Sequence, residues 1–210
     1  MTFSGFPDAG PAFYEGLEAD NSKTYWLAHK AVYESAIREP MLALVDALEG
    51  EFGEARLFRP YRDVRFSADK SPYKTHQGAF TGADTAFGYY VQMSADGLAL
   101  GGGFRATSTA VTARYRAAVD ASGSGLELEA ALAPIVANGF EVLGDAVATA
   151  PRGYPRDHPR IELLRRKELL VIQRLGMPDW VNTPGAADQI AAAWRSLQPL
   201  RSWVDRHVFG

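Results

Sequence analysis

The spacing of apolar residues indicates helices at both ends of the chain. Apolar side chains recur there every three or four positions, which is the period of an amphipathic helix. Three helices are predicted near the N-terminus. The first covers 10–19, Asp20-Asn21-Ser22 supplies cap residues for the second, and the third begins at Pro40 and ends near Gly50. We expect Pro40 to interrupt the helical path, because proline lacks a donor and disfavours helical geometry in the residue before it.

The middle of the chain has the character of a β-sheet. Asp96-Gly97 predicts a tight hairpin between two strands. The three consecutive glycines at 101–103 predict a bulge, or the close approach of another backbone or of a ligand. The predicted strands cover 73–80, 87–93 and 98–104.

The second half of the chain returns mainly to helical spacing. Thr107 or Ser108 would cap one helix, and Ser124-x-x-Glu127 has the pattern of a capping box for the next. Pro134 predicts a kink or an early end in that helix. The remaining predictions are a strand at 140–143, a short helix after His158, a strand at 169–172 with a continued helix as its alternative, and a last helix over 187–207 that Pro199 divides.

Helices therefore flank a central group of strands, and the strands do not alternate regularly with helices. This order predicts an α+β fold with a mainly antiparallel sheet and a tight hairpin, flanked by N- and C-terminal helices. No repeat, low-complexity segment or linker divides the chain. We expect residues 1–210 to form a single domain.

Composition narrows the chemistry. The 210 residues are 47% hydrophobic and contain no cysteine, which excludes disulfides and thiolate nucleophiles. A net charge of −3 argues against general nucleic-acid binding. No apolar run approaches the roughly 20 residues of a membrane span, and the N-terminus lacks the features of a signal peptide, so a cytoplasmic protein is expected. Neither a metal-binding histidine pattern nor a nucleotide fingerprint is present, and no cofactor or metal is expected.

One stretch, 58–74, differs from the rest of the chain. Aromatic residues and prolines are interleaved there with five cations and two carboxylates, Asp63 and Asp69, a net charge of about +3. An arginine fork binds a carboxylate or phosphate at two points, which points to an anionic ligand. An Arg–Asp network that joins the sheet to helices would use the same residues. The cations are Arg59, Arg62, Arg65, Lys70 and Lys74.

The three arginines of this stretch need not act alike. In an extended segment Arg59 and Arg65 share one side, and Arg62 points to the other. We expect Arg62 to belong to an anion site. Arg65 stands between Val64 and Phe66, and we expect it to be held within the fold.

Other residues extend the candidate chemistry. Ser67-x-x-Lys70 has the spacing of a Ser–Lys catalytic pair, although that spacing is common by chance. His76 either faces the site or lies in the sheet, and His29, on an aromatic helix stripe, is interpreted as a hydrogen-bonded core residue. The predicted ligand-binding residues are Arg59, Arg62, Arg65, Lys70, Tyr73, Lys74, His76 and Arg152.

Arg152-Gly153-Tyr154 is a second candidate for anion binding. A cation and a glycine turn precede a predicted helix start at Asp157 or His158, and free N–H groups at a helix start attract anions. An ordinary structural loop is the alternative. If the two basic motifs share one site, Arg152 lies near the stretch 58–74, and we expect that proximity.

Several motifs along nearly the whole chain belong to one pattern. They are Phe3-x-Gly5-Phe6, Asn21-Ser22-Lys23, Arg59-x-Tyr61-Arg62-Asp63-x-Arg65-Phe66-Ser67-x-Asp69-Lys70-Ser71-Pro72-Tyr73-Lys74-Thr75-His76, Pro151-Arg152-Gly153-Tyr154 and His158-Pro159. With these motifs the chain resembles the uncharacterised family named domain of unknown function 2461. The resemblance implies one soluble domain and supplies no activity.

Two hypotheses follow for function. The first is a basic, aromatic-lined pocket that binds a small phosphate- or carboxylate-bearing ligand; whether the ligand is also turned over, and so whether the protein is an enzyme, stays open. The second is a non-enzymatic interaction protein, in which the Arg/Asp cluster is structural or docks an acidic partner. A concave pocket favours the first and a flat surface favours the second. The oligomeric state is not predicted.

Overall fold

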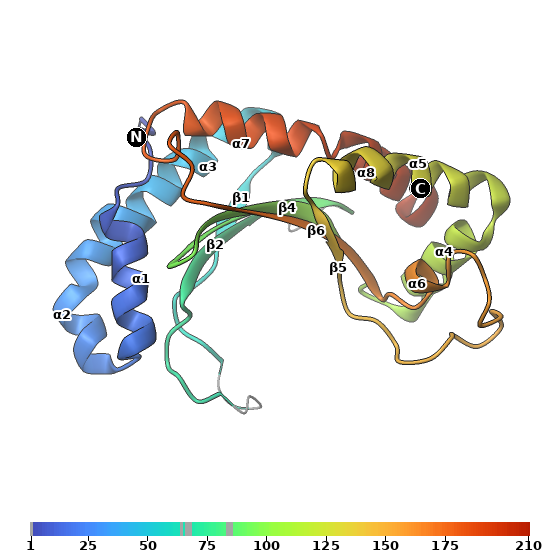
Figure 1. The fold of residues 1–210 in the computed structure, drawn as a ribbon, viewed down its shortest axis with the longest axis horizontal. Helices are drawn as coiled ribbons and strands as arrows, with labels where there is room; N and C mark the ends of the chain where they lie inside the picture. The colour runs from blue at the N-terminus through green and yellow to red at the C-terminus, as the bar shows by residue number, and fades with distance from the viewer. Residues whose placement is uncertain (1, 64, 66–68, 83–85) are drawn as a thin grey trace. The chain divides into compact units, whose positions relative to one another are not determined.

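The strands form one antiparallel sheet, and along the chain helices come before, between and after them, as a computed structural model shows (Figure 1). The structure describes residues 2–63, 65, 69–82 and 86–210. Within these residues the strand order is β1-β2-β3-β4-β6-β5, and β3 and β4 form the tight hairpin. The predicted α+β class is therefore confirmed. The strands are β1 (Ala55–Leu57), β2 (His76–Thr81), β3 (Gly88–Ser94), β4 (Gly97–Arg105), β5 (Glu141–Leu143) and β6 (Glu168–Gly176).

The chain folds into two compact units. Unit 1 consists of Met1–Ala83, Tyr90–Leu100 and Arg174–Ala192, and unit 2 consists of Asp84–Tyr89, Gly101–Gln173 and Ala193–Gly210. Strands β3, β4 and β6 pass from one unit into the other, and a single domain stays a prediction. The helices are α1 (Ala9–Ala19), α2 (Lys23–Tyr33), α3 (Glu39–Phe52), α4 (Thr109–Asp120), α5 (Ser122–Ala137), α6 (Ile161–Leu164), α7 (Ala186–Arg195) and α8 (Gln198–Val204), with π-helical turns η1 (Glu34–Arg38) and η2 (Asp205–Phe209).

The first helix of unit 1 has nearly the predicted bounds, and the second begins after one of the predicted cap residues. Ser22 is the N-cap of α2, and its hydroxyl accepts a hydrogen bond from the Tyr25 N–H at 3.1 Å. Apolar faces of α1 and α2 then meet in an aromatic cluster. Its buried residues are Phe13, Tyr14, Leu17, Trp26, Tyr33, Ile37 and Tyr73.

The third helix begins at Glu39, one residue before the predicted start at Pro40, but the expected departure of Glu39 from helical geometry is wrong. Glu39 keeps helical angles, φ −63° and ψ −46°, and its N–H donates to the carbonyl of Glu34, five residues back. This π-helical turn takes up an extra residue, so Pro40 falls in the first turn of α3, where its missing N–H removes no helical hydrogen bond. Gly50 lies near the end of α3, as predicted: the helix ends at Phe52, and its C-cap Gly53 has φ +86°.

Helices of unit 2 agree with the sequence except at two positions. Ser108 caps α4 as predicted. The capping box at Ser124 is wrong, because α5 already begins at Ser122, and the Ser124 hydroxyl donates instead to the Ala118 carbonyl at 2.6 Å. Pro134 does not end α5 early, since the helix continues to Ala137. The division of the last helix before Pro199 is confirmed by α7 and α8.

Glycines in β4 allow a close approach of β6, which confirms one of the alternatives predicted for them. A Cβ atom on Gly101 would lie 2.3 Å from the Val171 carbonyl oxygen, and one on Gly103 would lie 2.1 Å from the Leu169 carbonyl oxygen. Real Cβ contacts are not that short, so these two positions in β4 exclude side chains.

We expect Gly101→Ala to lower the free energy of unfolding by about 1–3 kcal/mol, because the backbone of β6 must move to admit the methyl group. Gly50→Ala is the matched control: nothing lies within 4 Å of its added Cβ, and it should stabilise by about 0.5–1 kcal/mol as a helix-interior substitution. Urea unfolding of both variants measures the difference. Equal effects would contradict the close contact between β4 and β6.

Candidate functional site

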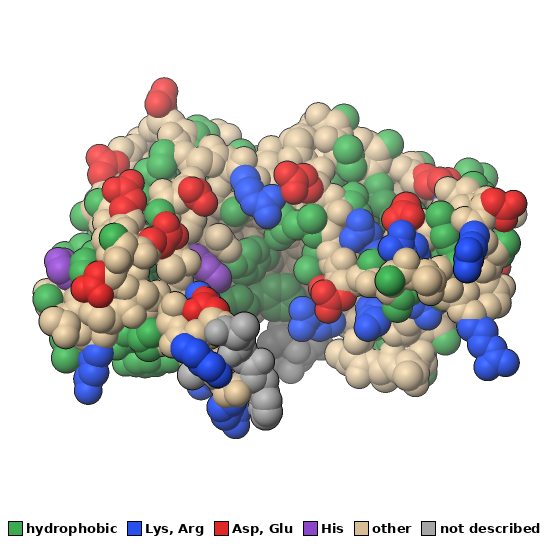
Figure 2. Space-filling view, turned by 60° about the horizontal axis from the view of Figure 1, so that its bottom comes forward, with side chains coloured by type: hydrophobic (Ala, Val, Ile, Leu, Met, Phe, Trp, Pro, Cys, Tyr) green, Lys and Arg blue, Asp and Glu red, His purple; other side chains and the backbone are tan. Residues whose placement is uncertain are grey.

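The basic stretch forms a two-armed hairpin that extends from β1 and β2. The Arg62 N–H donates to the Pro72 carbonyl at 2.9 Å, and the Lys74 N–H donates to the Pro60 carbonyl at 2.8 Å. Tyr61 and Tyr73 pair as an isolated antiparallel bridge between the arms. We call the described residues 58–63, 65 and 69–76 the cationic hairpin. In Figure 2, Lys and Arg side chains gather at the lower left of the view, where this hairpin projects.

Tyr73 anchors the cationic hairpin to the helices of unit 1. Its ring stacks on Trp26, with centroids 4.4 Å apart and planes 6° apart. The Asn21 side chain binds both backbone groups of Tyr73: its amide donates to the carbonyl at 3.0 Å and its oxygen accepts from the N–H at 3.1 Å. Tyr73 is 5% exposed. Its place among the predicted ligand-binding residues stays a prediction, and the contacts give it a structural role.

Gln77 makes a second anchor at the base of the cationic hairpin. Its side-chain oxygen accepts a hydrogen bond from the Tyr33 hydroxyl at 2.6 Å, and its amide donates to the Phe58 carbonyl at 2.9 Å. Both Gln77 and Tyr33 are buried, and burial raises the pKa of Tyr33 to about 12. Buried polar groups that are satisfied in this way hold one arrangement, so the strand that carries His76 has a fixed position against α2.

Two of the arginines form ion pairs within the cationic hairpin itself. Arg62 pairs with Asp69. Arg65 donates from Nε and Nη2 to the two oxygens of Asp63, at 3.0 and 2.7 Å, and this bidentate contact is the main cause that holds the pKa of Asp63 below its usual value. The Arg65 side chain is 76% exposed, so the expectation that it is held within the fold is wrong. Its partner lies two residues away, and the pair therefore closes a local turn at the surface.

Lys74 lies near an aromatic ring and near two of the arginines. Lys74 Nζ lies 5.1 Å from the ring centroid of Phe58. Burial is the main cause that lowers the pKa of Lys74, and Arg59 and Arg62 lower it further. No salt bridge or hydrogen bond in the described part of the chain involves the ammonium group of Lys74 or the guanidinium of Arg59.

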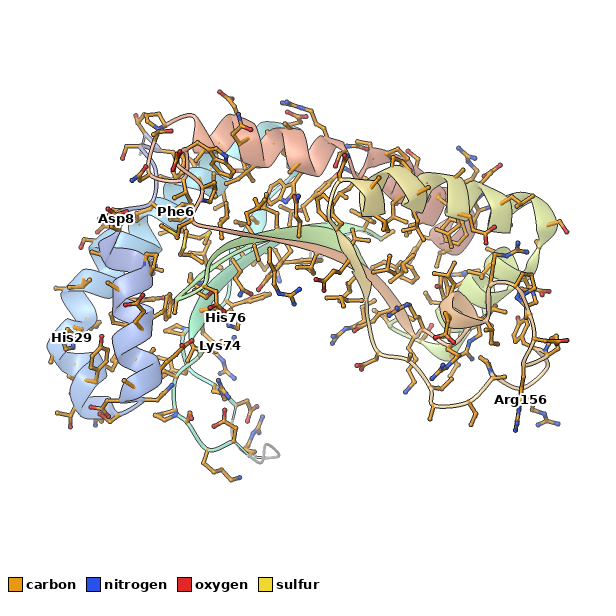
Figure 3. The ribbon with its side chains drawn as sticks, in the orientation of Figure 1. Phe6, Asp8, His29, Lys74, His76 and Arg156 are labelled. Carbon is orange, nitrogen blue, oxygen red and sulfur yellow. The ribbon has the colours of Figure 1, made fainter. Side chains whose placement is uncertain are left out.

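His76 follows Lys74 at the start of β2, and Figure 3 shows the two labelled side chains close together. Burial lowers the pKa of His76, and the charges of Lys74 and Arg62 lower it further. Within the described residues the ring makes no hydrogen bond. Burial and the two cations thus favour the neutral imidazole of His76, and of these cations Arg62 is paired with Asp69.

The sheet register adds residues that the sequence analysis missed. His76 lies opposite Ser94, and Gly78 lies opposite Gln92. Alternate residues of neighbouring strands share a face, so Gln92 and Tyr90 extend the face that carries His76. The Tyr90 hydroxyl donates to the Gln92 side-chain oxygen at 2.7 Å. The alternation of side chains along strand 87–93 could have indicated that Tyr90 and Gln92 share a face. The pairing of this strand with β2 could not be predicted from the sequence.

Phe58 and Tyr90 give this face an aromatic border. Their ring centroids are 6.1 Å apart, and Phe58 is 38% exposed. A Cβ on Gly78 would lie 2.8 Å from the Tyr90 hydroxyl oxygen and 3.1 Å from the Phe58 ring, so only glycine allows both rings to cover the strand here. We call Phe58, Arg62, Lys74, His76 and Gln92 the candidate site.

Several predicted residues lie elsewhere. Lys70 is exposed in the tip of the cationic hairpin, and Ser67, its proposed catalytic partner, lies outside the described residues. His29 is half-buried: its ring Nδ1 lies 2.9 Å from the Tyr25 carbonyl and the ring stacks on Tyr25, so it is hydrogen-bonded but not a core residue. Arg152 is exposed and belongs to unit 2, and its proximity to the cationic hairpin stays a prediction.

The loop around Arg152 does not end in the predicted helix start. The helix α6 begins only at Ile161 and has four residues. The N–H groups before it are already used, because Arg160 N–H donates to His158 Nδ1 at 3.0 Å and Ile161 N–H donates to the His158 carbonyl at 3.0 Å. The helix-terminus argument for a second anion site is therefore wrong, and the alternative of a structural loop fits these contacts.

Several arginines of unit 2 bind backbone carbonyls. Arg160 donates to the carbonyls of Val119 and Asp120, at 2.7 and 3.0 Å, at the C-terminal end of α4. Arg166 donates to the carbonyls of Gly144 and Val142 at 3.1 and 3.0 Å. Cations at helix C-termini and in loops satisfy carbonyls that lack other donors. These arginines hold chain segments together, unlike Lys74 in unit 1.

Residues 10–203 match the family described as conserved hypothetical protein (DUF2461), and the chain belongs to this family. This confirms the resemblance seen in the motifs. No curated protein matches the chain. Within the described residues, every helix is too short or too polar to cross a membrane.

The Asn21 contact gives a stability prediction. Asn21→Ala should lower the free energy of unfolding by about 1–3 kcal/mol, because it leaves the buried N–H and carbonyl of Tyr73 without their partners. Asn182→Ala, an exposed loop substitution in the same unit, should change it by less than about 0.5 kcal/mol. Chemical denaturation compares the two. A neutral Asn21→Ala would show that the anchor does not hold the cationic hairpin.

The charge crowding gives a pH prediction. In Lys74→Met the pKa of His76 should rise towards its ordinary value, because one of the two cations that lower it is removed. Lys70→Met, whose charge is not among the causes, should leave it unchanged. NMR titration of the histidine ring signals measures both.

Because the folded state resists protonation of His76, stability should fall as pH drops through about 6.5, and by less in Lys74→Met.

Proposed function

We propose that the candidate site binds a small anionic ligand that carries a phosphate or carboxylate group. The observation that carries the proposal is the surplus of cations around Lys74. Arg59, Arg62 and Lys74 lie close enough for Arg59 and Arg62 to lower the pKa of Lys74. Of the three, only Arg62 forms a salt bridge within the described residues, and Arg59 lies near enough to the Asp63 carboxylate to help lower the pKa of Asp63. Like charges brought together at a folding cost are typical of a site that a ligand of opposite charge completes.

The aromatic residues support a preformed site. Tyr73 and Gln77 fix the strand that carries Lys74 and His76 by buried contacts, so the cations do not have to be ordered when a ligand binds. The exposed part of Phe58 offers an apolar surface beside the charges. Such a site needs no cofactor to bind an anion. Binding is proposed here, and turnover is not.

A specific observation favours a second function. Arg62–Asp69 and Arg65–Asp63 are ion pairs of the kind expected if the Arg/Asp cluster is structural, or docks an acidic partner. The side chains of both pairs are exposed to solvent, which screens such pairs, so each pair contributes little to stability. A structural role for them therefore predicts a small effect on stability and no response to small anions.

Thermal unfolding with inorganic phosphate and with sulfate separates the two functions. At constant ionic strength, each anion should raise the melting temperature of the wild type in a saturable way. Lys74→Met should abolish the response, and Arg62→Lys should weaken it, because lysine keeps the charge but loses the fork. Since the Arg62–Asp69 pair is partly exposed, Arg62→Lys should cost about 1 kcal/mol or less in stability.

Lys30→Met, on the exposed surface of α2, is the matched control for the loss of a lysine. It should respond to phosphate as the wild type does. A wild type whose melting temperature is the same in phosphate, sulfate and chloride would favour the interaction protein and reject the anion site.

A further inference from the structure

Only one of the two polar groups of the Gln92 side-chain amide is hydrogen-bonded within the described residues. Its oxygen accepts the Tyr90 hydroxyl at 2.7 Å. Within the described residues nothing accepts a hydrogen bond from its NH2 group. A primary amide has two N–H donors, so the contact with Tyr90 leaves both of them directed away from the oxygen. Gln92 is only partly buried, which makes these donors accessible.

The sheet places this amide beside the cations. Gln92 pairs with Gly78, and His76 occupies the next position on the same face of β2. Diagonal neighbours across antiparallel strands lie about 7–8 Å apart at the backbone, near enough for both side chains to reach one small oxyanion. Gly78 adds no side chain between them, and its lack of a Cβ is what allows the Tyr90 hydroxyl to reach Gln92.

The number and kind of donors distinguish between anions. Lys74 has three N–H donors, Gln92 has two, and the neutral His76 ring has one. A carboxylate offers two oxygens, whereas a phosphate monoester offers three terminal oxygens and carries about −1.5 to −2 charge at neutral pH. Gln92 and His76 add neutral donors to the cation of Lys74. This set of donors suits the larger number of acceptor oxygens on a phosphate. The partly exposed ring of Phe58 then lies beside the site, where the organic group of an ester would extend.

We propose that the ligand of the candidate site is a phosphate monoester, and that Gln92 selects it by donating hydrogen bonds from its amide to a phosphate oxygen. This inference rests on the proposed anion-binding function. It assigns Gln92 a recognition role that the motif around the arginines did not indicate, and it narrows the ligand from any small anion to one class.

Calorimetric titration with phenyl phosphate and with benzoate tests the ligand class, because the two share a ring and differ in the anion. The wild type should bind phenyl phosphate at least about tenfold more tightly than benzoate, the ratio expected for one extra charge-assisted hydrogen bond. Phenyl phosphate should also bind more tightly than inorganic phosphate, because of the contact with Phe58.

Two variants test the residue. Gln92→Glu keeps an acceptor for the Tyr90 hydroxyl but replaces the donors by negative charge, and it should weaken phenyl phosphate binding at least about tenfold. Gln92→Met keeps the volume without donors and should also weaken it, while leaving benzoate binding less affected. Gln189→Glu, on the exposed surface of α7, adds the same charge elsewhere in unit 1 and should leave phenyl phosphate binding nearly unchanged. Circular dichroism and melting curves confirm that each variant is folded.

The outcomes separate this inference from the function on which it rests. Equal binding of benzoate and phenyl phosphate would overturn the phosphate assignment and leave the anion site standing. A preference for phenyl phosphate that persists unchanged in folded Gln92→Glu and Gln92→Met would overturn the role of Gln92. Binding of no anion at all would reject the anion site itself, and this inference with it.

Discussion

The stacking of Tyr73 on Trp26 is the contact on which the cationic hairpin depends. It joins a surface excursion of the sheet to the aromatic cluster of α1 and α2, and the Asn21 side chain satisfies both backbone groups of Tyr73 at the same place. Without such an anchor, a segment rich in like charges would gain little from folding against the protein, because charged side chains are costly to bury. Here two planar rings bury apolar area while the charges remain near the surface.

The anchor also explains why charges of one sign stay close together. Arg59, Arg62 and Lys74 repel one another, and the lowered pKa of Lys74 reflects that repulsion together with burial. The exposed ion pairs of Arg62 and Arg65 offset only a small part of such a cost. The buried contacts of Tyr73 and Gln77 therefore hold the cations in place. Like charges held together at a cost in protein stability are the arrangement expected where a ligand of opposite charge binds.

Unit 2 uses arginine for a different purpose. Arg160 donates to backbone carbonyls at the end of α4, and the two terminal nitrogens of Arg166 donate to carbonyls in β5 and directly after it. The same residue type thus marks a candidate site in one unit and a structural joint in the other. Composition does not separate the two roles, whereas the partners of each guanidinium do.

Local patterns in the sequence determined most of the elements and the basic character of the cationic hairpin. Helical spacing, the caps at Ser22 and Ser108, and the Asp96-Gly97 turn act through neighbouring residues, so they are readable without the fold. The π-helical turn before Pro40 and the start of α5 ahead of Ser124 were not predicted, because each depends on the helical segments around it and not on a short motif. Only the tertiary structure decided the site itself. The strand register placed Gln92 beside His76, and the packing of Tyr73 removed its ring from the surface. Those contacts join residues far apart in the chain, and no local pattern encodes them.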